Sequence, residues 1–454
     1  MPDSPVGAHS RAAESCSILP AIVTAHGQLS FRELESAAAR AERQSGVIRG
    51  NIAGVALGQT VEAIVLLRAL MRLGAVACMI NPRWPQNEVD RAMTAAGCTR
   101  RIDRFTLEGA DAEAEQTEME AGQPATVIFT SGSTGDPKPA VHSADNHRQS
   151  ALAGNANIPL QPGDRWLLSL PLHHVGGIGI LFRCAAAGAA VAVPDPEMPL
   201  ARALDILHPT HLSLVPTQLH RLLDDQDAAR RLARVKTVLM GGAPIPPSLV
   251  QRAFQLGIPI HTSYGLTETS SQITATRPGD DLDALMTVGA PLTPGTVSIS
   301  PGSEIFVRGK TLFLGYLQNK TLYRPLDANG WFATGDLGRF DNNGRLIVTG
   351  RRDNMFISGG ENVQPEEVER RLCALPGVQQ ALVVPVQDDE YGEVGAAFIK
   401  MAHASPPDPV RLAAQLREQL PPCKIPKHFR PWPANLPESA TKTGRRLTAR
   451  TLFP

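Results

Sequence analysis

The segment at residues 129–141 concentrates hydroxyl groups, glycines and one lysine in a way that suits the binding of phosphate. It reads FTSGSTGDPKPAV and follows a β-branched run that predicts a buried strand at residues 126–130. Small residues after a strand let backbone N–H groups approach an anion, and Lys138 would offset the charge of that anion. The segment is not a Walker A loop, because prolines on both sides of Lys138 exclude a helix start there. A flexible Ser/Gly linker is the alternative, but linkers seldom follow a strand directly.

Three further motifs occur downstream, at residues 263–269 (SYGLTET), 333–338 (ATGDLG) and 350–369 (GRRDNMFISGGENVQPEEVE). Together with the phosphate-binding segment they resemble the signatures of the adenylate-forming enzymes, which comprise acyl- and aryl-CoA synthetases, firefly luciferase and nonribosomal peptide adenylation domains. The resemblance runs from about residue 29 to the end of the chain. It implies an enzyme that uses ATP and Mg²⁺ to convert a carboxylic acid into an acyl-adenylate, and then transfers the acyl group to coenzyme A.

The chemistry implied by this resemblance explains why hydroxyls and glycines gather in the first motif. A carboxylate is a poor electrophile because its leaving group would be oxide, whereas an acyl-adenylate loses AMP. Hydroxyl groups and glycine amides are suited to hold the departing β- and γ-phosphates of ATP. By resemblance, the residues around these phosphates are Thr130, Ser131, Gly132, Ser133, Thr134, Gly135 and Lys138.

The SYGLTET motif provides the metal site in the same family. Glu268 would coordinate Mg²⁺, which bridges phosphate oxygens while negative charge shifts in the transition state. Thr267 would lie beside the α-phosphate, and Tyr264 and Gly265 complete the nucleotide-binding part of the motif. The alternative for Glu268 is an acid at a helix N-terminus that is stabilised by the helix dipole.

The remaining motifs would bind the nucleoside and coenzyme A. Asp336 offers acceptor oxygens for the two ribose hydroxyls, with help from Arg351, although Asp336 could also be a turn residue before a strand. Gly359 and Gly360 resemble the flexible segment that faces the pantetheine channel. Small residues after a strand would let adenine or the acyl group lie against the backbone, and these are Gly241, Gly242 and Ala243.

The C-terminal catalytic lysine of the family has two candidate matches in the segment SATKTGRRLTAR at residues 439–450. In relatives this lysine contacts the substrate carboxylate and an α-phosphate oxygen. Lys442 keeps the spacing to Arg445, whereas an alignment on Thr443 and Gly444 would put Arg445 in the place of the lysine. We favour Lys442, because an ammonium is a compact point charge that fits between two oxygens and a guanidinium is wider. A basic solvated tail is the remaining interpretation.

Composition excludes several other classes of protein. Lysine plus arginine equal aspartate plus glutamate at 44 each, so no global field favours nucleic acid or an anionic membrane. The six cysteines contain no CxxC pair, which is typical of a reducing compartment and predicts a cytoplasmic protein. The most apolar stretch, residues 61–80, contains Arg68, Arg72 and Gly74, which favours a helix followed by a strand over a membrane span. A homo-oligomer is compatible with the sequence.

The pattern of elements predicts an α/β protein. Ser30 and Glu33 form a capping box for a helix that reaches about Gln44, and alternating strand and helix patterns continue to about residue 300. This alternation predicts mainly parallel sheets. A DNNG turn joins the second and third of a set of short strands at residues 304–308, 337–340 and 345–349.

We expect a large N-terminal domain with mainly parallel sheets and a small β-barrel-like part, followed by a small mobile α+β domain. Residues 1–28 are polar and predict a disordered lead-in. Residues 29–349 would bind ATP and the acyl group, and residues 350–454 would form the swivelling domain. The resemblance puts the hinge at Asp353.

The middle of the chain resembles one subgroup, the o-succinylbenzoate–CoA ligases of menaquinone synthesis, through SLPLHHVGGIGILFR, THLSLVPTQLHRLL and MGGAPIP. A second ionised carboxylate on the substrate needs a partner when buried, and the candidates are Arg183 and Arg221. Either could instead be a surface arginine whose stem covers apolar residues. His174 matches an acyl-pocket position, although a lone histidine is more often structural.

Two other functions stay open at this point. The acid could be a benzoate, anthranilate, cinnamate or medium-chain fatty acid, with the same chemistry at the reacting carboxylate. The irregular lysine motif would also fit an adenylate-binding protein with weak ligase activity that loads a carrier protein.

Overall fold

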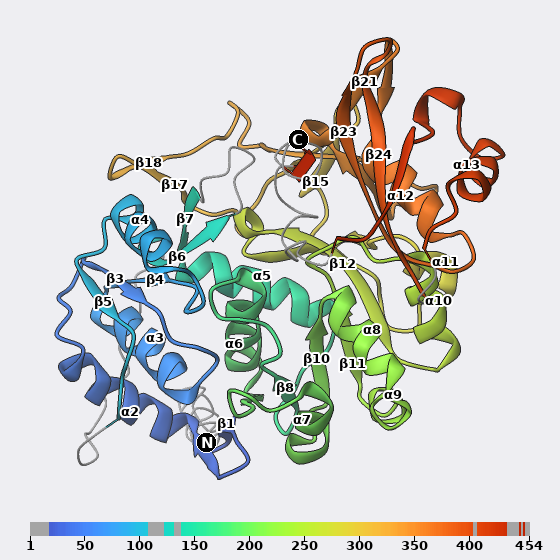
Figure 1. Cartoon of the computed structure of the whole chain (residues 1–454). Helices are drawn as coiled ribbons and strands as arrows, with labels where there is room; N and C mark the ends of the chain where they lie inside the picture. Colours follow the sequence, from blue (N-terminus) through green and yellow to red (C-terminus); the bar gives the residue numbers. More distant parts are fainter. Residues whose placement is uncertain are drawn as a thin grey trace, which may run out of the picture.

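The computed structural model describes residues 18–107, 122–130, 138–402, 406–433, 445 and 448–449 (Figure 1). Most of the phosphate-binding segment and one of the two C-terminal lysine candidates lie outside these ranges. The predicted site residues concerned are Ser131, Gly132, Ser133, Thr134, Gly135 and Lys442.

A nine-stranded sheet forms one layer of the large N-terminal body. Its central strands, from β12 to β1, run parallel, as the alternation of strands and helices predicts, and both edges are antiparallel. In spatial order the strands are β14 (Ala290–Pro291), β13 (Ser271–Ala275), β12 (Ile260–Leu266), β11 (Thr237–Met240), β10 (His211–Leu214), β8 (Arg165–Leu167), β9 (Ala190–Ala192), β1 (Pro20–Val23) and β2 (Gln28–Ser30).

A seven-stranded sheet forms the second layer. Four strands, from β6 to β5, are parallel, and the other edge is built from antiparallel strands, so the sheet is mixed. In spatial order the strands are β18 (Thr321–Tyr323), β17 (Gly315–Gln318), β7 (Lys138–Ser143), β6 (Pro124–Thr130), β4 (Val76–Met79), β3 (Ile52–Val55) and β5 (Arg100–Ile102).

Helices connect the parallel strands, and some of them pack between the two sheets. The predicted capping box is confirmed, because the side chain of Ser30 accepts from the backbone of Glu33 and the Glu33 carboxylate accepts from Ser30. The helices of the body are α2 (Phe31–Gln44), α3 (Val61–Leu73), α4 (Gln86–Ala96), α5 (Ala144–Asn157), α6 (Val175–Ala187), α7 (Leu200–Leu207), α8 (Pro216–Asp224), α9 (Gln226–Leu232), α10 (Pro247–Gln255) and α11 (Leu282–Leu285).

The largest core cluster joins the two sheets. It contains Met79 and Ile128 from the seven-stranded sheet, Trp166 from the nine-stranded sheet, and Leu66 of α3 and Ile178 of α6. Each side chain of this size contributes about 1.5–3 kcal/mol when it is fully buried. The two helices are therefore fixed on both sides, which makes them rigid supports for polar residues that they carry.

A four-stranded antiparallel sheet follows the two large sheets. Its strands, in spatial order, are β15 (Val297–Ile299), β16 (Glu304–Val307), β19 (Phe332–Phe340) and β20 (Leu346–Arg351). The DNNG turn between β19 and β20 is confirmed, with the N–H of Gly344 bonded to the carbonyl of Asp341 at 3.1 Å. This sheet corresponds to the barrel-like part of the prediction.

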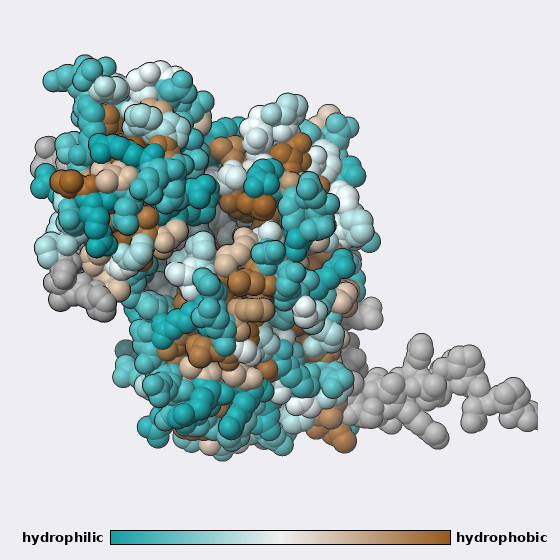
Figure 2. All heavy atoms as spheres, turned by 90° about the vertical axis from the view of Figure 1, so that its right-hand side faces the viewer, coloured by the Kyte–Doolittle hydropathy of each residue, from teal (hydrophilic) through white to brown (hydrophobic). Residues whose placement is uncertain are grey.

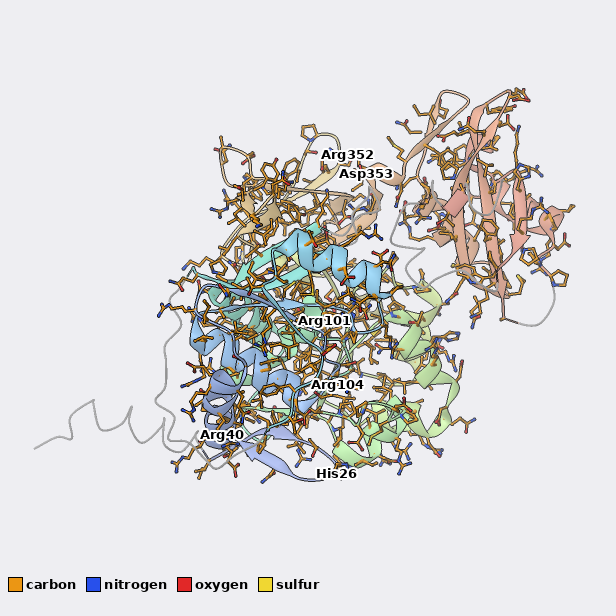
Figure 3. All side chains as sticks on the ribbon, turned by 60° about the vertical axis from the view of Figure 1, so that its left-hand side comes forward. His26, Arg40, Arg101, Arg104, Arg352 and Asp353 are labelled. Atoms are coloured by element: carbon orange, nitrogen blue, oxygen red, sulfur yellow. The ribbon has the colours of Figure 1, made fainter. Side chains whose placement is uncertain are left out.

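The C-terminal sheet is separate from the other three. It contains β22 (Glu361–Val363), β21 (Phe356–Ser358), β24 (Gly392–Met401), β23 (Val378–Asp388) and β25 (His428–Pro431). Its own core packs it against α12 (Pro365–Cys373) and α13 (Pro409–Arg417), near η3 (Pro422–Lys424). Arg352 and Asp353 lie in η2 (Arg352–Asn354), at the junction between this sheet and the larger body (Figure 3).

The prediction of a disordered lead-in is wrong for residues 18–28. Strand β1 pairs with β9 in parallel and with β2 in antiparallel orientation. Ala21, Ile22 and Val23 are buried, and Ile22 belongs to the core cluster between the sheets. Three consecutive apolar residues are enough to extend the sheet by one strand, although the surrounding sequence is polar.

The surface supports a globular protein without a spanning helix. Figure 2 shows one face that is mainly hydrophilic, with apolar side chains in small separate groups. Among the described residues, none of the helices combines the length and the apolar character that crossing a membrane requires.

Candidate active site

The predicted metal ligand lies in a tight turn between two antiparallel strands. Strand β12 ends at Leu266, the 3₁₀ helix η1 (Thr267–Thr269) follows, and β13 then returns beside β12. A Cβ on Gly265 would lie 2.1 Å from the carbonyl oxygen of Ser271, so only glycine fits there. Ser270 has φ 58°, a conformation that non-glycine residues seldom adopt and that is often found at functional sites.

The Glu268 side chain is 9% exposed and has a defined environment. The Tyr316 hydroxyl of β17 donates to Glu268 Oε1, and the Phe313 N–H donates to the Glu268 carbonyl at 2.9 Å. The Lys138 ammonium lies 5.9 Å from the centre of the Tyr316 ring. Glu268 and Lys138, which the sequence placed in separate motifs, therefore both lie beside one tyrosine, Glu268 at its hydroxyl and Lys138 near its ring.

Two buried histidines lie behind this turn. His142 of β7 donates from Nε2 to the carbonyl of Thr267 at 2.7 Å, and its ring stacks on His147 of α5 at 5.0 Å. Burial lowers the pKa of His142 to about 4 and also lowers the pKa of His147. Both rings are therefore neutral near pH 7, and His142 holds the backbone of the turn by an uncharged N–H.

Buried neutral histidines predict that the protein loses stability in mild acid. Burial lowers the pKa of His211 to about 4, as for His142, and both side chains are at most 1% exposed. An unfolded histidine binds a proton below about pH 6.5. The folded state resists that proton, so the free energy of unfolding is constant above this pH and falls as the pH drops towards 4.

Thermal melting between pH 8 and pH 4 would measure this loss. One pKa unit corresponds to about 1.4 kcal/mol, so we expect a loss of several kcal/mol below pH 6.5. His211→Gln should make the fall in melting temperature towards low pH less steep, and the same change at the exposed His208 should not. A melting temperature that stays level from pH 7 to pH 4.5 would refute the assignment of neutral buried histidines.

Asp336 is a buried carboxylate on β19 with two donors. Arg351 donates to its Oδ1 at 2.9 Å, and the Tyr264 hydroxyl donates to its Oδ2 at 2.7 Å. Burial raises the pKa of Asp336, and the charge of Arg351 opposes that shift. Each carboxylate oxygen can accept a further hydrogen bond, so this geometry is compatible with the predicted role at the ribose hydroxyls.

The glycines of the GGA motif follow β11 as predicted. A Cβ on Gly241 would lie 2.9 Å from Ser263 Oγ, and Gly242 has φ 78°. Both observations explain glycine at these two positions by the requirements of the backbone itself. Gly359 and Gly360 form the turn between β21 and β22, with φ 57° and 88°.

Arg183 is the most unusual charged residue near the site. It lies on α6, is 2% exposed, and its guanidinium stacks over the ring of Trp166 at 4.8 Å. Neither Nη1 nor Nη2 has a hydrogen-bond partner among the residues that the structure describes. Burial lowers the pKa of Arg183 to about 10, which leaves it charged at neutral pH. A buried charge without a partner costs several kcal/mol, so this position calls for an anion.

Two further features lie beside the Arg183 guanidinium. Nε2 of Gln272, on β13, is buried and also lacks a partner within the described part of the chain. Gly154 of α5 makes room, because a Cβ there would lie 2.1 Å from Arg183 Nη2 and 3.0 Å from Gln272 Nε2. One helical turn before Arg183, Gly179 faces Ser271, which connects this polar group to the turn that carries Glu268.

The other two predicted substrate residues lie elsewhere. Arg221 is exposed on α8, which agrees with the alternative that it is a surface arginine. His174 is the exposed N-cap residue of α6, with its ring 4.6 Å from His173. Arg183 is therefore the predicted substrate residue that is both buried and near the nucleotide motifs.

Arg445 has a structural environment in the C-terminal domain. It is 5% exposed, its Nη2 lies 3.0 Å from Glu366 Oε1, and its Nη1 donates to the carbonyl of Val383 at 2.9 Å and to Glu369. Two carboxylates of α12 thus neutralise its charge. This environment argues against Arg445 as the catalytic cation in this domain pose, and the assignment of Lys442 stays a prediction.

The donor set around Glu268 fits Mg²⁺ that arrives with a nucleotide. Within the described ranges, no group of three or more histidine, cysteine, aspartate or glutamate side chains is arranged to hold a metal ion. Mg²⁺ commonly binds through one or two carboxylates, substrate phosphates and water. A single buried carboxylate beside a phosphate-binding segment matches that pattern.

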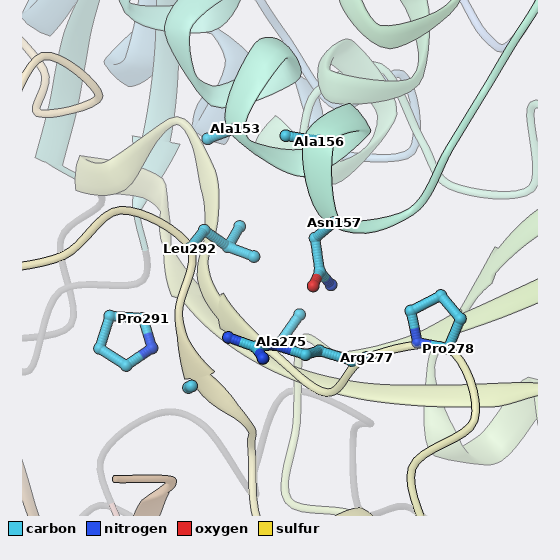
Figure 4. Close-up of a pocket in the computed structure, with 9 residues that line it drawn as sticks. Ala153, Ala156, Asn157, Ala275, Arg277, Pro278, Pro291 and Leu292 are labelled. Carbon is cyan, nitrogen blue, oxygen red and sulfur yellow. The ribbon is translucent and has the colours of Figure 1, made fainter.

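A pocket of about 430 Å³ lies between α5 and the strands β13 and β14 (Figure 4). Its walls are mainly small and apolar, with Arg277 and Asn157 as polar members. None of the predicted site residues lines it, and we assign it no role in the reaction.

Sequence reasoning missed several residues of the site. The motifs that carry the family resemblance gave no role to four of them: Tyr316, His142, Gln272 and Gly154. Each acts through a contact with a residue that is distant in sequence. Glu268 and Tyr316, for example, are 48 positions apart. No local pattern signals such pairs.

Comparison with known proteins defines the class. The profile of the AMP-binding enzyme family matches residues 10–317, and the AMP-binding enzyme C-terminal domain matches residues 367–445. The first match covers more than half of the chain. This protein belongs to the AMP-binding enzyme family.

Individual proteins are similar to this chain over most of its length. The 2-succinylbenzoate–CoA ligase of Salmonella typhimurium LT2 is 39% identical over 414 residues, which cover 88% of this chain and 87% of the relative. The o-succinylbenzoate CoA synthetase of Bacillus subtilis, in complex with the acyl-adenylate intermediate OSB-AMP, superposes with a TM-score of 0.83 at 28% identity, covering 100% and 99% of the two chains. The same B. subtilis enzyme in complex with ATP and magnesium ion gives 0.84 at 28% identity, covering 96% and 98%.

Proposed function

We propose that this protein is an ATP-dependent ligase that joins 2-succinylbenzoate to coenzyme A through an acyl-adenylate. The relatives support this function because they match nearly the whole chain, including both family domains. ATP and coenzyme A are the co-substrates, and Mg²⁺ is the metal ion. As the sequence resemblance implies, the thioester product would enter menaquinone synthesis.

The observation that carries the choice of acid is the buried guanidinium of Arg183, whose Nη1 and Nη2 have no hydrogen-bond partner among the described residues. 2-Succinylbenzoate has an aliphatic carboxylate that reacts and an aromatic carboxylate that stays ionised. A guanidinium binds a carboxylate through two parallel N–H bonds, and Gln272 Nε2 offers a third donor. We place the aromatic carboxylate at Arg183, because an acid without it would leave this buried charge unpaired.

The reaction has two steps in which the protein positions the reactants. In the first, an oxygen of the aliphatic carboxylate attacks the α-phosphorus of ATP, and pyrophosphate leaves. In the second, the sulfur of coenzyme A attacks the acyl carbon, AMP leaves, and the thiol proton passes to solvent. Positioning of reactants in this way supplies much of the rate acceleration.

Several of the predicted residues have a place in this scheme. Thr130 and Lys138 border the segment that would hold the pyrophosphate, and Lys442 would stabilise charge between the carboxylate and the α-phosphate. Asp336, with Tyr264 beside it, would orient the ribose. Bound at Glu268, Mg²⁺ would neutralise charge on the phosphate oxygens.

Exchange of labelled pyrophosphate into ATP tests the adenylation step without coenzyme A. We expect exchange that depends on 2-succinylbenzoate and Mg²⁺, with little exchange for benzoate, cinnamate or octanoate. Equal exchange with octanoate would refute the substrate assignment, and no exchange with any acid would favour an adenylate-binding protein.

Gly154→Ala tests whether the space around Arg183 matters for the acid. The new Cβ would push the guanidinium aside, and a misplacement of about 1 Å can lower the rate by about 100-fold. We therefore expect kcat/KM for 2-succinylbenzoate to fall by about this factor, with the KM for ATP little changed. Gly58→Ala is the matched control, because a Cβ there meets no described atom within 4 Å. An active site that tolerates the alanine at position 154 would contradict the assignment.

A further inference from the structure

We propose that Tyr316 is a positioning residue for the metal-binding carboxylate, holding Glu268 so that its second oxygen faces Mg²⁺ of the bound nucleotide. This inference rests on the proposed role of Glu268. Tyr316 lies in a strand outside the four motifs, and the family resemblance gave it no role.

The first argument is the contact itself. The Tyr316 hydroxyl donates to Oε1 of Glu268, which leaves Oε2 as the oxygen available to a metal ion. A carboxylate that rotates freely would present either oxygen to the metal ion. Ordering such a carboxylate on binding costs conformational entropy. A fixed donor on one oxygen removes that freedom before the nucleotide binds.

The second argument is that the tyrosine is itself rigid. Its ring packs edge-on against Phe313 at 4.7 Å between ring centres, and the Phe313 N–H bonds to the Glu268 carbonyl. The backbone of the same turn is held by His142, which bonds to the Thr267 carbonyl, and by Ser270, whose hydroxyl donates to the carbonyl of Thr311 at 2.9 Å. Side chain and backbone of Glu268 are thus fixed from different elements.

The third argument is the position of Lys138. Its ammonium lies 5.9 Å from the centre of the Tyr316 ring, at the first residue of β7, directly after the phosphate-binding segment. β7 and β17 are hydrogen-bonded neighbours, with Tyr316 opposite Ala140. Tyr316 therefore contacts the carboxylate that would bind the metal ion through its hydroxyl, and its ring lies beside the lysine that would bind the phosphates.

The test is the Mg²⁺ dependence of nucleotide binding, measured without turnover. Isothermal calorimetry with a non-hydrolysable ATP analogue, at Mg²⁺ concentrations from micromolar to 20 mM, would compare the full-length wild type with Tyr316→Phe. Phenylalanine keeps the ring and removes the hydroxyl alone. We expect the Mg²⁺ midpoint to rise about tenfold, since the hydroxyl donates to a charged acceptor, while binding without Mg²⁺ is unchanged.

Two further variants make the result decisive. Tyr323→Phe, on β18 opposite Tyr316 and 52% exposed, removes a hydroxyl from the same hairpin and should leave the midpoint unchanged. Glu268→Gln should raise the midpoint more than Tyr316→Phe does. If Glu268→Gln shifts the midpoint and Tyr316→Phe does not, the positioning role is wrong and the metal site stands. If Glu268→Gln leaves the midpoint at the wild-type value, Glu268 is not the metal ligand, and the inference on Tyr316 falls with it.

A purely structural role for Tyr316 gives a different outcome. It would lower the melting temperature and weaken binding equally with and without Mg²⁺. That pattern would also overturn the inference, because a positioning effect is confined to the Mg²⁺-dependent part of binding.

Discussion

Arg183→Met is expected to lower kcat/KM for 2-succinylbenzoate by about 100- to 5,000-fold, because removal of one partner from a buried charge pair costs about 3–5 kcal/mol. The same variant should use 4-oxo-4-phenylbutanoate, which lacks the ring carboxylate, as well as the wild type does or better. The wild type should discriminate strongly between the two acids, and the variant should not. Steady-state rates of thioester formation for both acids would measure the change.

The stability of the variant provides an internal control. The guanidinium of Arg183 has no hydrogen-bond partner among the described residues, and methionine fills a similar volume without a charge. Replacement of a buried charge by an apolar side chain is often neutral or stabilising, so the melting temperature should not fall. Arg221→Met examines the other predicted arginine, which is exposed on α8. Equal losses for both acids in Arg183→Met would show that Arg183 does not bind the ring carboxylate.

Lys442→Ala should abolish most adenylation and leave the fold intact. Loss of one preorganised group that stabilises transition-state charge costs about 10²- to 10³-fold in rate. Pyrophosphate exchange would fall by that factor. Thioester formation from chemically prepared acyl-adenylate should survive, because the second step proceeds without the carboxylate and α-phosphate contact.

Arg445→Met should have the opposite effects: it should destabilise the C-terminal domain and should leave adenylation intact while that domain stays folded. Arg445 pairs with Glu366 and Glu369 inside the C-terminal domain, so its loss leaves two buried carboxylates without their cation and costs about 3–5 kcal/mol. We expect a lower melting temperature of that domain. An unchanged exchange rate in Lys442→Ala, with a large loss in Arg445→Met at a temperature where it stays folded, would reverse the assignment of the two residues.

The sequence predicted the elements that carry the site because their signals are local. The capping box at Ser30, the β-branched run before Thr130 and the DNNG turn each depend on neighbours in the chain, and the structure has all three. The error at residues 18–28 arose from composition, since the polar segment hides the apolar run of β1. A short strand is stabilised by the strands it pairs with, and one of them, β9, lies about 170 positions away.

The candidate site was predictable to the extent that its residues lie in motifs. Glu268 and Asp336 were found through their motifs, and the structure buries both, with Tyr264 and Arg351 bonded to Asp336. The choice between Arg183 and Arg221 was not made from sequence, because burial depends on tertiary packing. Gly154 explains the difference, since it provides the room that the Arg183 guanidinium occupies.

The most direct test of the account is a competition experiment with purified protein, ATP, Mg²⁺, coenzyme A and five acids at equal concentration, with products identified by mass spectrometry. The acids are 2-succinylbenzoate, benzoate, anthranilate, cinnamate and octanoate. The account predicts that 2-succinylbenzoyl-CoA dominates and that this preference disappears in Arg183→Met. A dominant thioester of any monocarboxylate in the wild type would contradict it.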